Sequence, residues 1–235
     1  MIRQRPVELL APARNVECAM AAVDHGADAV YIGASRFGAR ASADNSVEDI
    51  ARVVEYAHTF RVKVYVTVNT ILKDEELPET EKLVWALYRA GVDALIVQDM
   101  ALMELDLPPI PLHASTQMSI TNSSGVDFAM GAGMERSVLA RELSLKEIGA
   151  ACSRGSEIET FIHGALCVCY SGQCLMSSLI GGRSGNRGRC AQPCRLPYKL
   201  LNVKDEDMLQ GKDAGQYLPV SYTHLRAHET RGNLV

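Results

Sequence analysis

The chain has 235 residues and a formal net charge of −4, and its content of 47% hydrophobic and 22% charged residues excludes a disordered or collagen-like chain. No stretch approaches the ~20 apolar residues that a membrane-spanning helix needs, and the charged first residues lack the apolar core of a secretory signal. We therefore expect a cytoplasmic protein with no membrane partner, and its length is close to the roughly 250 residues of an α/β barrel.

Short β-rich runs alternate with helical patterns over residues 1–165, which we expect to form a barrel core of about seven βα units. The runs cover residues 8–11, 29–32, 62–68, 94–97, 112–114, 137–140 and 159–162. Most of them are almost continuously apolar, as strands buried on both faces of a parallel sheet are. The alternation predicts an α/β protein with an incomplete TIM-barrel-like (β/α) fold, and an open doubly wound sheet is the alternative. An eighth strand would come from residues 198–203 or from beyond the end of this chain.

The predicted helices have recognisable ends. Ser46 and Asp49 have the spacing of a capping box, and Pro78 suits a first helical turn. Gly26 and Gly91 follow helical patterns as stop signals, and each begins a Gly-x-Asp-Ala-apolar segment that leads into a predicted strand. This weak internal repeat is typical of the turn between a helix and the next parallel strand.

Polar side chains follow nearly every predicted strand, at the end of a parallel barrel where ligands bind. They are Tyr31, Phe37 and Arg40; Asn69; Gln98 and Asp99; His113, Ser115 and Gln117; Arg141 and Glu142; and His163. We predict one pocket there, with His113, Arg141 and His163 as catalytic candidates and Asn69, Gln98 and Gln117 as substrate-binding residues. His113 and Arg141 are the best suited to handle a carboxylate or a proton. Each residue alone could instead cap a helix or form a local ion pair.

Five of the seven cysteines lie in one segment, residues 166–204, which we treat as a Cys-rich, Gly/Arg-rich region attached to the barrel. Cys167, Cys174, Cys190 and Cys194 are predicted metal ligands, because four thiolates joined by Gly-rich turns can hold an iron–sulfur cluster or Zn²⁺. The wide first gap favours a cluster, and buried reduced thiols are the alternative. Cys18 and Cys152 stand apart, and we expect them to be buried helix residues.

The same region is strongly basic. Residues 160–204 contain no acidic side chain and six basic ones, whereas the rest of the chain has a charge of −10. A local positive charge on an acidic protein implies an anionic partner, either the cluster itself or the phosphates of RNA. We predict that Arg183, Arg187 and Arg189 bind RNA from an exposed loop, and a solvated basic loop is the alternative.

The last part of the chain, residues 205–235, has a different character. After about residue 219 it shows no apolar stripe and no strand alternation, so we expect a non-native or disordered tail. His224 and His228 stand beside Glu229, but their order is not the His-Glu-x-x-His of a zinc protease.

Several blocks of the sequence resemble the collagenase-like peptidase family U-32. They begin at Glu8 (Glu-Leu-Leu-Ala-Pro-Ala), His113 (His-Ala-Ser-Thr-Gln-Met), Glu159 (Glu-Thr-Phe-Ile-His-Gly-Ala-Leu-Cys), Ser171 (Ser-Gly-Gln-Cys-Leu-Met-Ser) and Gly188 (Gly-Arg-Cys-Ala-Gln-Pro-Cys-Arg). The resemblance covers about residues 6–203 and implies a barrel-like N-terminal domain of a longer protein whose C-terminal part is missing here. The stretch 181–195 is most similar to the branch linked to 5-hydroxycytidine in ribosomal RNA.

Members of this family are labelled peptidases, and others are implicated in prephenate-linked hydroxylation of RNA bases with a [4Fe–4S] cluster. By position, Cys167, Cys174 and Cys190 match the cluster ligands, and Cys194 is the most available fourth. The resemblance therefore implies an enzyme that hydroxylates a base of ribosomal or transfer RNA, with prephenate or another small carboxylate as co-substrate. The alternatives are a collagenase-like peptidase, for which Cys167 and His163 could pair, and a non-catalytic zinc- or RNA-binding module.

Overall fold

Seven parallel strands form one curved sheet in this computed structural model, which describes residues 7–38, 45–165, 167, 169–196, 198–199, 201–206, 208 and 223–225. The strands are β1 (Leu10–Ala13), β2 (Ala29–Gly33), β3 (Lys63–Val68), β4 (Ala94–Val97), β5 (Leu112–Ala114), β6 (Arg136–Val138) and β7 (Glu157–Glu159). Each strand pairs in parallel with the next one along the chain. This half-barrel confirms the predicted TIM-barrel-like α/β fold, and every strand lies within a few residues of its predicted position.

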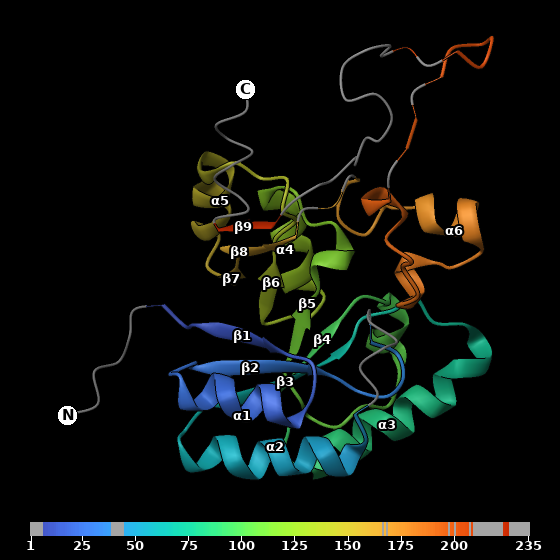
Figure 1. Ribbon diagram of the computed structural model, residues 1–235. Coiled ribbons are helices and arrows are strands. Elements are labelled where there is room, and N and C mark those ends of the chain that lie inside the picture. The colour runs from blue at the N-terminus through green and yellow to red at the C-terminus, as the bar shows by residue number, and fades with distance from the viewer. Residues whose placement is uncertain are drawn as a thin grey trace.

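Helices cover the outer face of the sheet. In chain order they are α1 (Val16–Asp24), α2 (Val47–Thr59), α3 (Leu77–Arg89), α4 (Ser123–Gly131) and α5 (Leu145–Cys152). A 3₁₀ helix, η2 (Met100–Glu104), takes the place of an α-helix after β4, and the Asp99 side chain caps it. Figure 1 shows α1 and α2 side by side beneath β1–β3. The capping box of Ser46 and Asp49 is confirmed, as is Pro78 in the first turn of α3.

The core has two sides because alternate residues of a strand point to opposite faces. Val64 and Val66 of β3 are fully buried against the helices, together with Ile32 of β2. On the inner face Tyr65 packs against the small side chains Ala29 and Ala94. Small neighbours leave room for one large ring, so the inside of the barrel is filled by side chains.

The Gly-x-Asp repeat fixes the start of two strands. Gly26 and Gly91 have φ values of +88° and +85°, a conformation that glycine adopts without steric cost. The Asp28 carboxylate accepts a hydrogen bond from the backbone N–H of Leu9 at 2.8 Å, and Asp93 does the same for Val64 at 2.7 Å. Each aspartate thereby ties its own strand to the preceding one, which sets the register between neighbours.

A buried guanidinium lies inside the barrel where the strands begin. Arg136, at the start of β6, has a side chain that is 9% exposed. It binds Glu8 Oε1 at 2.6 Å and Glu157 Oε2 at 2.7 Å, and it lies 3.6 Å from Glu159 Oε2. The Tyr65 hydroxyl donates to Glu8 at 3.0 Å. This network joins the segment before β1 to β7, the two edges of the sheet, which backbone pairing leaves unconnected.

The prediction of an eighth sheet strand from residues 198–203 is wrong for the residues that the structure describes there. The chain leaves the sheet after β7, and β8 (His163–Ala165) pairs antiparallel with β9 (Thr223–Leu225) in a separate small sheet. β9 falls within the predicted tail, of which 205–206, 208 and 223–225 are described and the remainder lies outside the described residues. Within the described ranges, the structure contains no helix both long enough and apolar enough to cross a bilayer.

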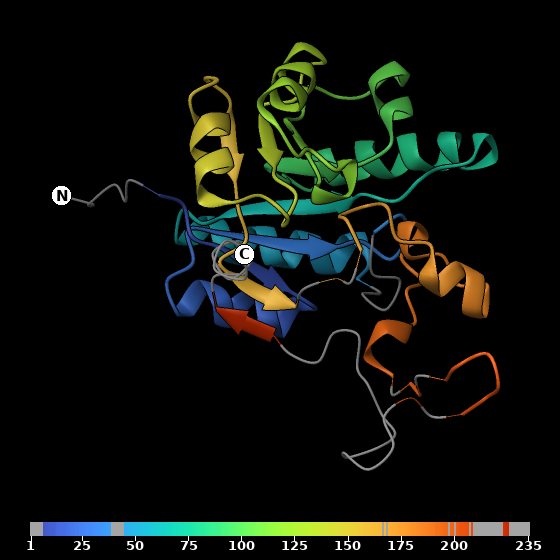
Figure 2. The ribbon, with the colours of Figure 1, turned by 90° about the horizontal axis from the view of Figure 1, so that it is seen from above.

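The cysteine-rich segment lies at the carboxyl ends of the strands. It carries the short helix α6 (Met176–Gly181) and two 3₁₀ turns, η4 (Gly185–Arg187) and η5 (Pro193–Arg195). Figure 2 shows this orange segment at the end of the molecule toward which the blue strands point. The fold therefore brings the cysteines to the end of the barrel where ligands bind in such folds.

Replacing Arg136 by Met tests the interior network. The change leaves the carboxylates of Glu8 and Glu159 without their positive partner, so we expect a loss of about 3–5 kcal/mol in the free energy of unfolding. Urea unfolding followed by circular dichroism measures it. The matched control is Arg52→Met, because the pair of Arg52 with Asp49 is exposed and should contribute less than about 1 kcal/mol. Equal losses in both variants would contradict a structural role for the network.

Glu159 adds a pH dependence to the same network. Burial raises the pKa of its carboxyl from 4.5 to about 7, with Arg136 opposing this shift and Glu8 adding to it. A raised folded-state pKa in an acid stabilises the fold fully below about pH 4.5, and that contribution is lost as the pH rises to about 7. We expect Glu159→Gln, which mimics the protonated acid, to flatten the decline of unfolding free energy over this window. If the unfolding free energy of the variant declined as steeply as that of wild type, another titrating group would be the cause.

Candidate active site

The rim of the barrel brings together three of the predicted substrate-binding residues. Asn69 follows β3, and its Nδ2 donates to Ser115 Oγ after β5 at 3.1 Å. Gln98 follows β4, and its Nε2 donates to the backbone oxygen of Gln117 at 3.4 Å. The hydroxyl of Ser115 also accepts from the Gln117 N–H at 3.2 Å. Loops from three neighbouring strands thus form one connected set of amides and hydroxyls.

His113 is not part of this set, contrary to the prediction of one shared pocket. It lies within β5, one residue before the strand end, and its side chain points into the barrel. Its ring packs edge-on against Tyr65 at 4.8 Å between centroids. Burial, together with the charge of Arg136, lowers the pKa of His113 to about 4, so the ring is neutral near pH 7. A catalytic role for His113 remains a prediction, but its position is among the interior network.

His163 also lies apart from the rim residues. It is an exposed residue of β8, and it pairs with Leu225 of β9 in the small antiparallel sheet. The sequence placed it after a seventh strand that continues to residue 162, whereas β7 ends at Glu159. The prediction that His163 faces the same pocket as Asn69 and Gln98 therefore fails on the position of the strand end.

Arg141 reaches the cysteine-rich segment. Its Nη2 donates to Cys167 Sγ at 2.8 Å, and its guanidinium lies 5.8 Å from the centre of the Phe161 ring. The neighbouring Glu142 accepts hydrogen bonds from the N–H and the hydroxyl of Ser171. The loop after β6 thus binds the segment at Cys167 and at Ser171. The sequence indicated Arg141 as a catalytic candidate, with a local ion pair to Glu142 as the alternative, and did not indicate the contact with Cys167.

Gly172 packs against the rim where a side chain would not fit. Its φ is +74°, and a Cβ atom there would lie 2.1 Å from the backbone oxygen of Gln117. Such an overlap with backbone cannot be relieved by a side-chain movement. The glycine therefore allows the cysteine-rich segment to pack directly on the loop that follows β5.

Cys194 lies within electrostatic range of the other three predicted ligand cysteines. Burial raises the pKa of the Cys194 thiol, Arg195 lowers it, and negative charge on Cys167, Cys190 and Cys174 raises it again. The convergence of all four thiols on one site stays a prediction. Among the residues that are described, however, no three His, Cys, Asp or Glu side chains have metal-binding geometry.

The chemistry of this donor set fits a cluster or Zn²⁺. Four thiols are available, the guanidinium of Arg141 contacts Cys167, and the backbone N–H of Gln192 donates to Cys190 Sγ at 3.4 Å. N–H groups and cations around sulfur compensate the negative charge of a metal–thiolate site. Cys18 and Cys152 lie on α1 and α5 but are exposed, so the prediction that they are buried is wrong.

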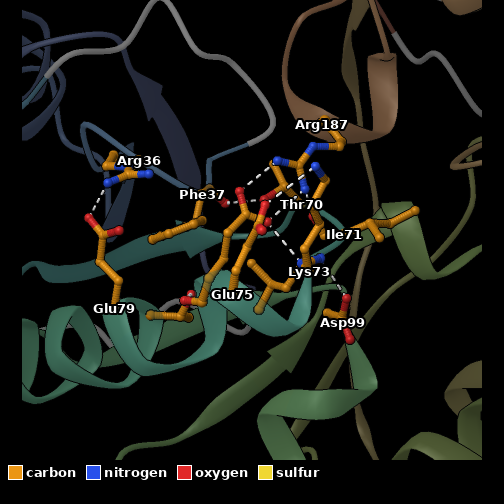
Figure 3. A network of polar contacts seen from close by, with 12 residues as sticks. Arg36, Phe37, Thr70, Ile71, Lys73, Glu75, Glu79, Asp99 and Arg187 are labelled. Carbon is orange, nitrogen blue, oxygen red and sulfur yellow. Dashed lines mark hydrogen bonds and ion pairs between the residues drawn. The ribbon is translucent and has the colours of Figure 1, made fainter.

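Arg187 connects the segment to the loop after β3, and Figure 3 shows it pointing toward Ile71 in that loop. Its two Nη atoms donate to both carboxylate oxygens of Glu76, at 2.8 and 2.6 Å, and Nη1 also donates to the Ile71 oxygen at 2.9 Å. The Ile71 N–H donates to the Asn186 oxygen at 3.1 Å. These contacts give Arg187 an intramolecular partner, which the sequence did not indicate. Arg183 and Arg189 are exposed, as a loop that binds phosphate requires.

Comparison with known proteins identifies the family to which this chain is similar. The model of Peptidase family U32 matches residues 14–231, a range that includes much of the predicted tail. The chain is 55% identical over 250 residues to the 23S rRNA 5-hydroxycytidine synthase of Escherichia coli (strain K12), covering 94% of this chain and 38% of that protein. It is 43% identical over 208 residues to tRNA hydroxylation protein P1 of Bacillus subtilis (strain 168), covering 86% of this chain and 49% of that protein.

A solved structure of a U32 peptidase has a similar fold. It aligns with a TM-score of 0.55 at 13% identity, over 69% of this chain and 72% of that one. This likeness supports the barrel architecture. The chain spans less than half of the length of the two curated relatives, at 38% and 49%.

Gly172→Ala should detach the cysteine-rich segment from the rim. A left-handed backbone costs an alanine about 1–2 kcal/mol, and the overlap with the Gln117 oxygen adds to this. We expect faster proteolysis within residues 169–196 and a lower metal content. Gly131→Ala is the matched control, because its Cβ would meet nothing within 4 Å. Equal proteolysis of the two variants would show that this contact does not position the segment.

Arg187→Ala should also release the segment, because it removes both hydrogen bonds to Glu76. Arg187 lowers the pKa of Glu76 from 4.5 to about 2, so the pair is intact above about pH 4.5 and is lost as the pH falls toward 2. We expect proteolysis of residues 181–195 to rise in wild type over this range, and in Arg187→Ala already at neutral pH. Pepsin at acidic pH and trypsin at neutral pH provide the measurement. Arg189→Ala, an exposed residue of the same loop, is the control and should behave as wild type.

Proposed function

This chain belongs to peptidase family U32, and from that membership we propose that the protein hydroxylates a base of ribosomal or transfer RNA in the cytoplasm. The observation that carries the proposal is the attachment of the cysteine-rich segment to the rim of the barrel, where Arg141 donates to Cys167 and Gly172 packs on Gln117. Two relatives named for hydroxylated RNA support the reaction class, and the E. coli relative supports a 5-hydroxycytidine product.

Cys167, Cys174, Cys190 and Cys194 would hold a [4Fe–4S] cluster in this proposal. Such a cluster supplies electron transfer, which a base hydroxylation requires and which amino-acid side chains do not provide. The basic surroundings support an anionic group: residues 160–204 carry six basic side chains and no acidic one. A structural Zn²⁺ on the same four thiols is the alternative occupant.

The chain's own residues would bind and orient the reactants. Arg141 is the candidate for the carboxylate of prephenate or another small co-substrate, because a guanidinium binds a carboxylate through two parallel hydrogen bonds. Asn69, Gln98 and Gln117 offer amides for uncharged polar groups of the substrate. The exposed Arg183 and Arg189 are placed for contacts with RNA phosphates.

A collagenase-like peptidase is the second candidate, and the name of the family favours it. A cysteine nucleophile needs a neighbouring base that can accept its proton. The contact made to Cys167 Sγ by Arg141 comes from a guanidinium, which donates hydrogen bonds and does not accept a proton. This contact favours the cluster over the nucleophile as the role of Cys167.

Anaerobic purification of the complete protein tests the proposal. We expect broad visible absorption with about four iron and four sulfide per chain, lost in Cys174→Ala and retained in Cys169→Ala. Cys169 is the matched control, because it lies in the same segment but outside the predicted ligand set. Nucleoside analysis of RNA from a deletion strain should show a missing hydroxylated base that wild type restores and Cys174→Ala does not. A colourless, zinc-loaded protein, or casein cleavage that needs Cys167, would contradict the proposal.

A further inference from the structure

A groove runs along the rim between the loops after β4, β5 and β6 and the cysteine-rich segment. It consists of two hollows with volumes of about 350 and 530 Å³. Ser119 and Thr121 line both hollows, so the two lie next to each other. Volumes of this size suit a small organic group rather than a single ion.

The first hollow presents hydrogen-bonding groups. Gln98, Gln117 and Asn122 line it with side-chain amides. The Oε1 atom of Gln98 is buried and accepts no hydrogen bond from the described part of the chain, while its Nε2 is fixed on the Gln117 oxygen. A buried acceptor without a donor is costly, and a ligand N–H would satisfy it.

Each hollow has an exposed aromatic ring in its wall. Phe128 of α4 lines the first hollow and is 64% exposed, and Tyr170 of the cysteine-rich segment lines the second and is also 64% exposed. Neither ring contributes to the hydrophobic core. Exposed rings beside fixed amides form the surface on which unpaired bases stack and are hydrogen-bonded along their edges.

We infer that this groove receives an unpaired nucleobase of the RNA substrate, stacked on Phe128 or Tyr170, and the inference rests on the proposed function. An enzyme that modifies a base must take it out of the stack, which requires such a pocket. Glu142 and Glu147 line the second hollow, so their negative charge keeps phosphates outside it. The exposed Arg183 and Arg189 on the neighbouring segment would bind the phosphates of the RNA backbone.

The position of the groove agrees with this use. Tyr170 lies between Cys167 and Cys174 in the sequence, and Gln173 of the same turn lines the second hollow. Gly172 packs on the Gln117 oxygen, which joins the turn to the wall of the first hollow. A base in the groove would therefore lie beside the predicted cluster ligands.

Binding of a single-stranded RNA oligonucleotide tests the groove directly. One base is replaced by a fluorescent analogue whose emission falls on stacking, and the complete protein with its metal is titrated into it. We expect quenching by wild type, and an affinity about 5- to 100-fold lower in Phe128→Leu or Tyr170→Leu. Phe128→Tyr and Tyr170→Phe should keep the wild-type affinity, because they keep a ring.

Phe60→Leu is the control, since Phe60 is also an exposed aromatic residue but lies at the end of α2, away from the rim. Wild-type affinity in both leucine variants would overturn the inference.

Complementation of a deletion strain separates this inference from the proposed function. If wild type restores a hydroxylated nucleoside and both leucine variants restore it equally, the groove is not the base site and the function stands. If wild type restores no hydroxylated nucleoside in any RNA, the proposed function fails. The fluorescence quenching, compared between wild type and the two leucine variants, then decides whether the groove binds bases. Loss of the nucleoside in the leucine variants, with iron content unchanged, supports both.

Discussion

The guanidinium of Arg136 connects two edges of a sheet that backbone hydrogen bonds leave apart. Its contacts with Glu8 before β1 and Glu157 in β7 close the interior of the half-barrel at the end where the strands begin. A charge in this position is stable only because carboxylates surround it. This closure holds the two edges of the curved sheet together, and the loops of the candidate site lie at the opposite ends of the same strands.

The cysteine-rich segment is attached to that curved rim at three places. Arg187 binds Glu76 after β3, Gly172 packs on Gln117 after β5, and Glu142 after β6 binds Ser171. Three attachments on different strands fix both the position and the orientation of a segment that has little regular structure of its own. Short helices and turns are otherwise poor at holding a site in place, so the barrel supplies the rigidity.

Local patterns in the sequence were sufficient for the strands, the capping box at Ser46 and the amides of the rim. Buried strands have apolar runs, and the residue that follows a strand is at the rim whatever the rest of the fold does. His113 was misplaced because it lies within β5 and not after it, so its ring packs on Tyr65 inside the barrel. The partners of Arg136 and Arg187 were missed because ion pairs between residues 128 and 111 positions apart leave no periodic signal.

The separation of Glu8 and Arg136 has a consequence for the order of folding. A chain made from its N-terminus presents β1 to β3, with Tyr65 and Glu8, long before the ribosome has added Arg136. Until then the inner face of these strands has no positive partner and no cover, and contacts between such distant residues form slowly. The network around Arg136 can therefore close the interior only after β6 and β7 have been made.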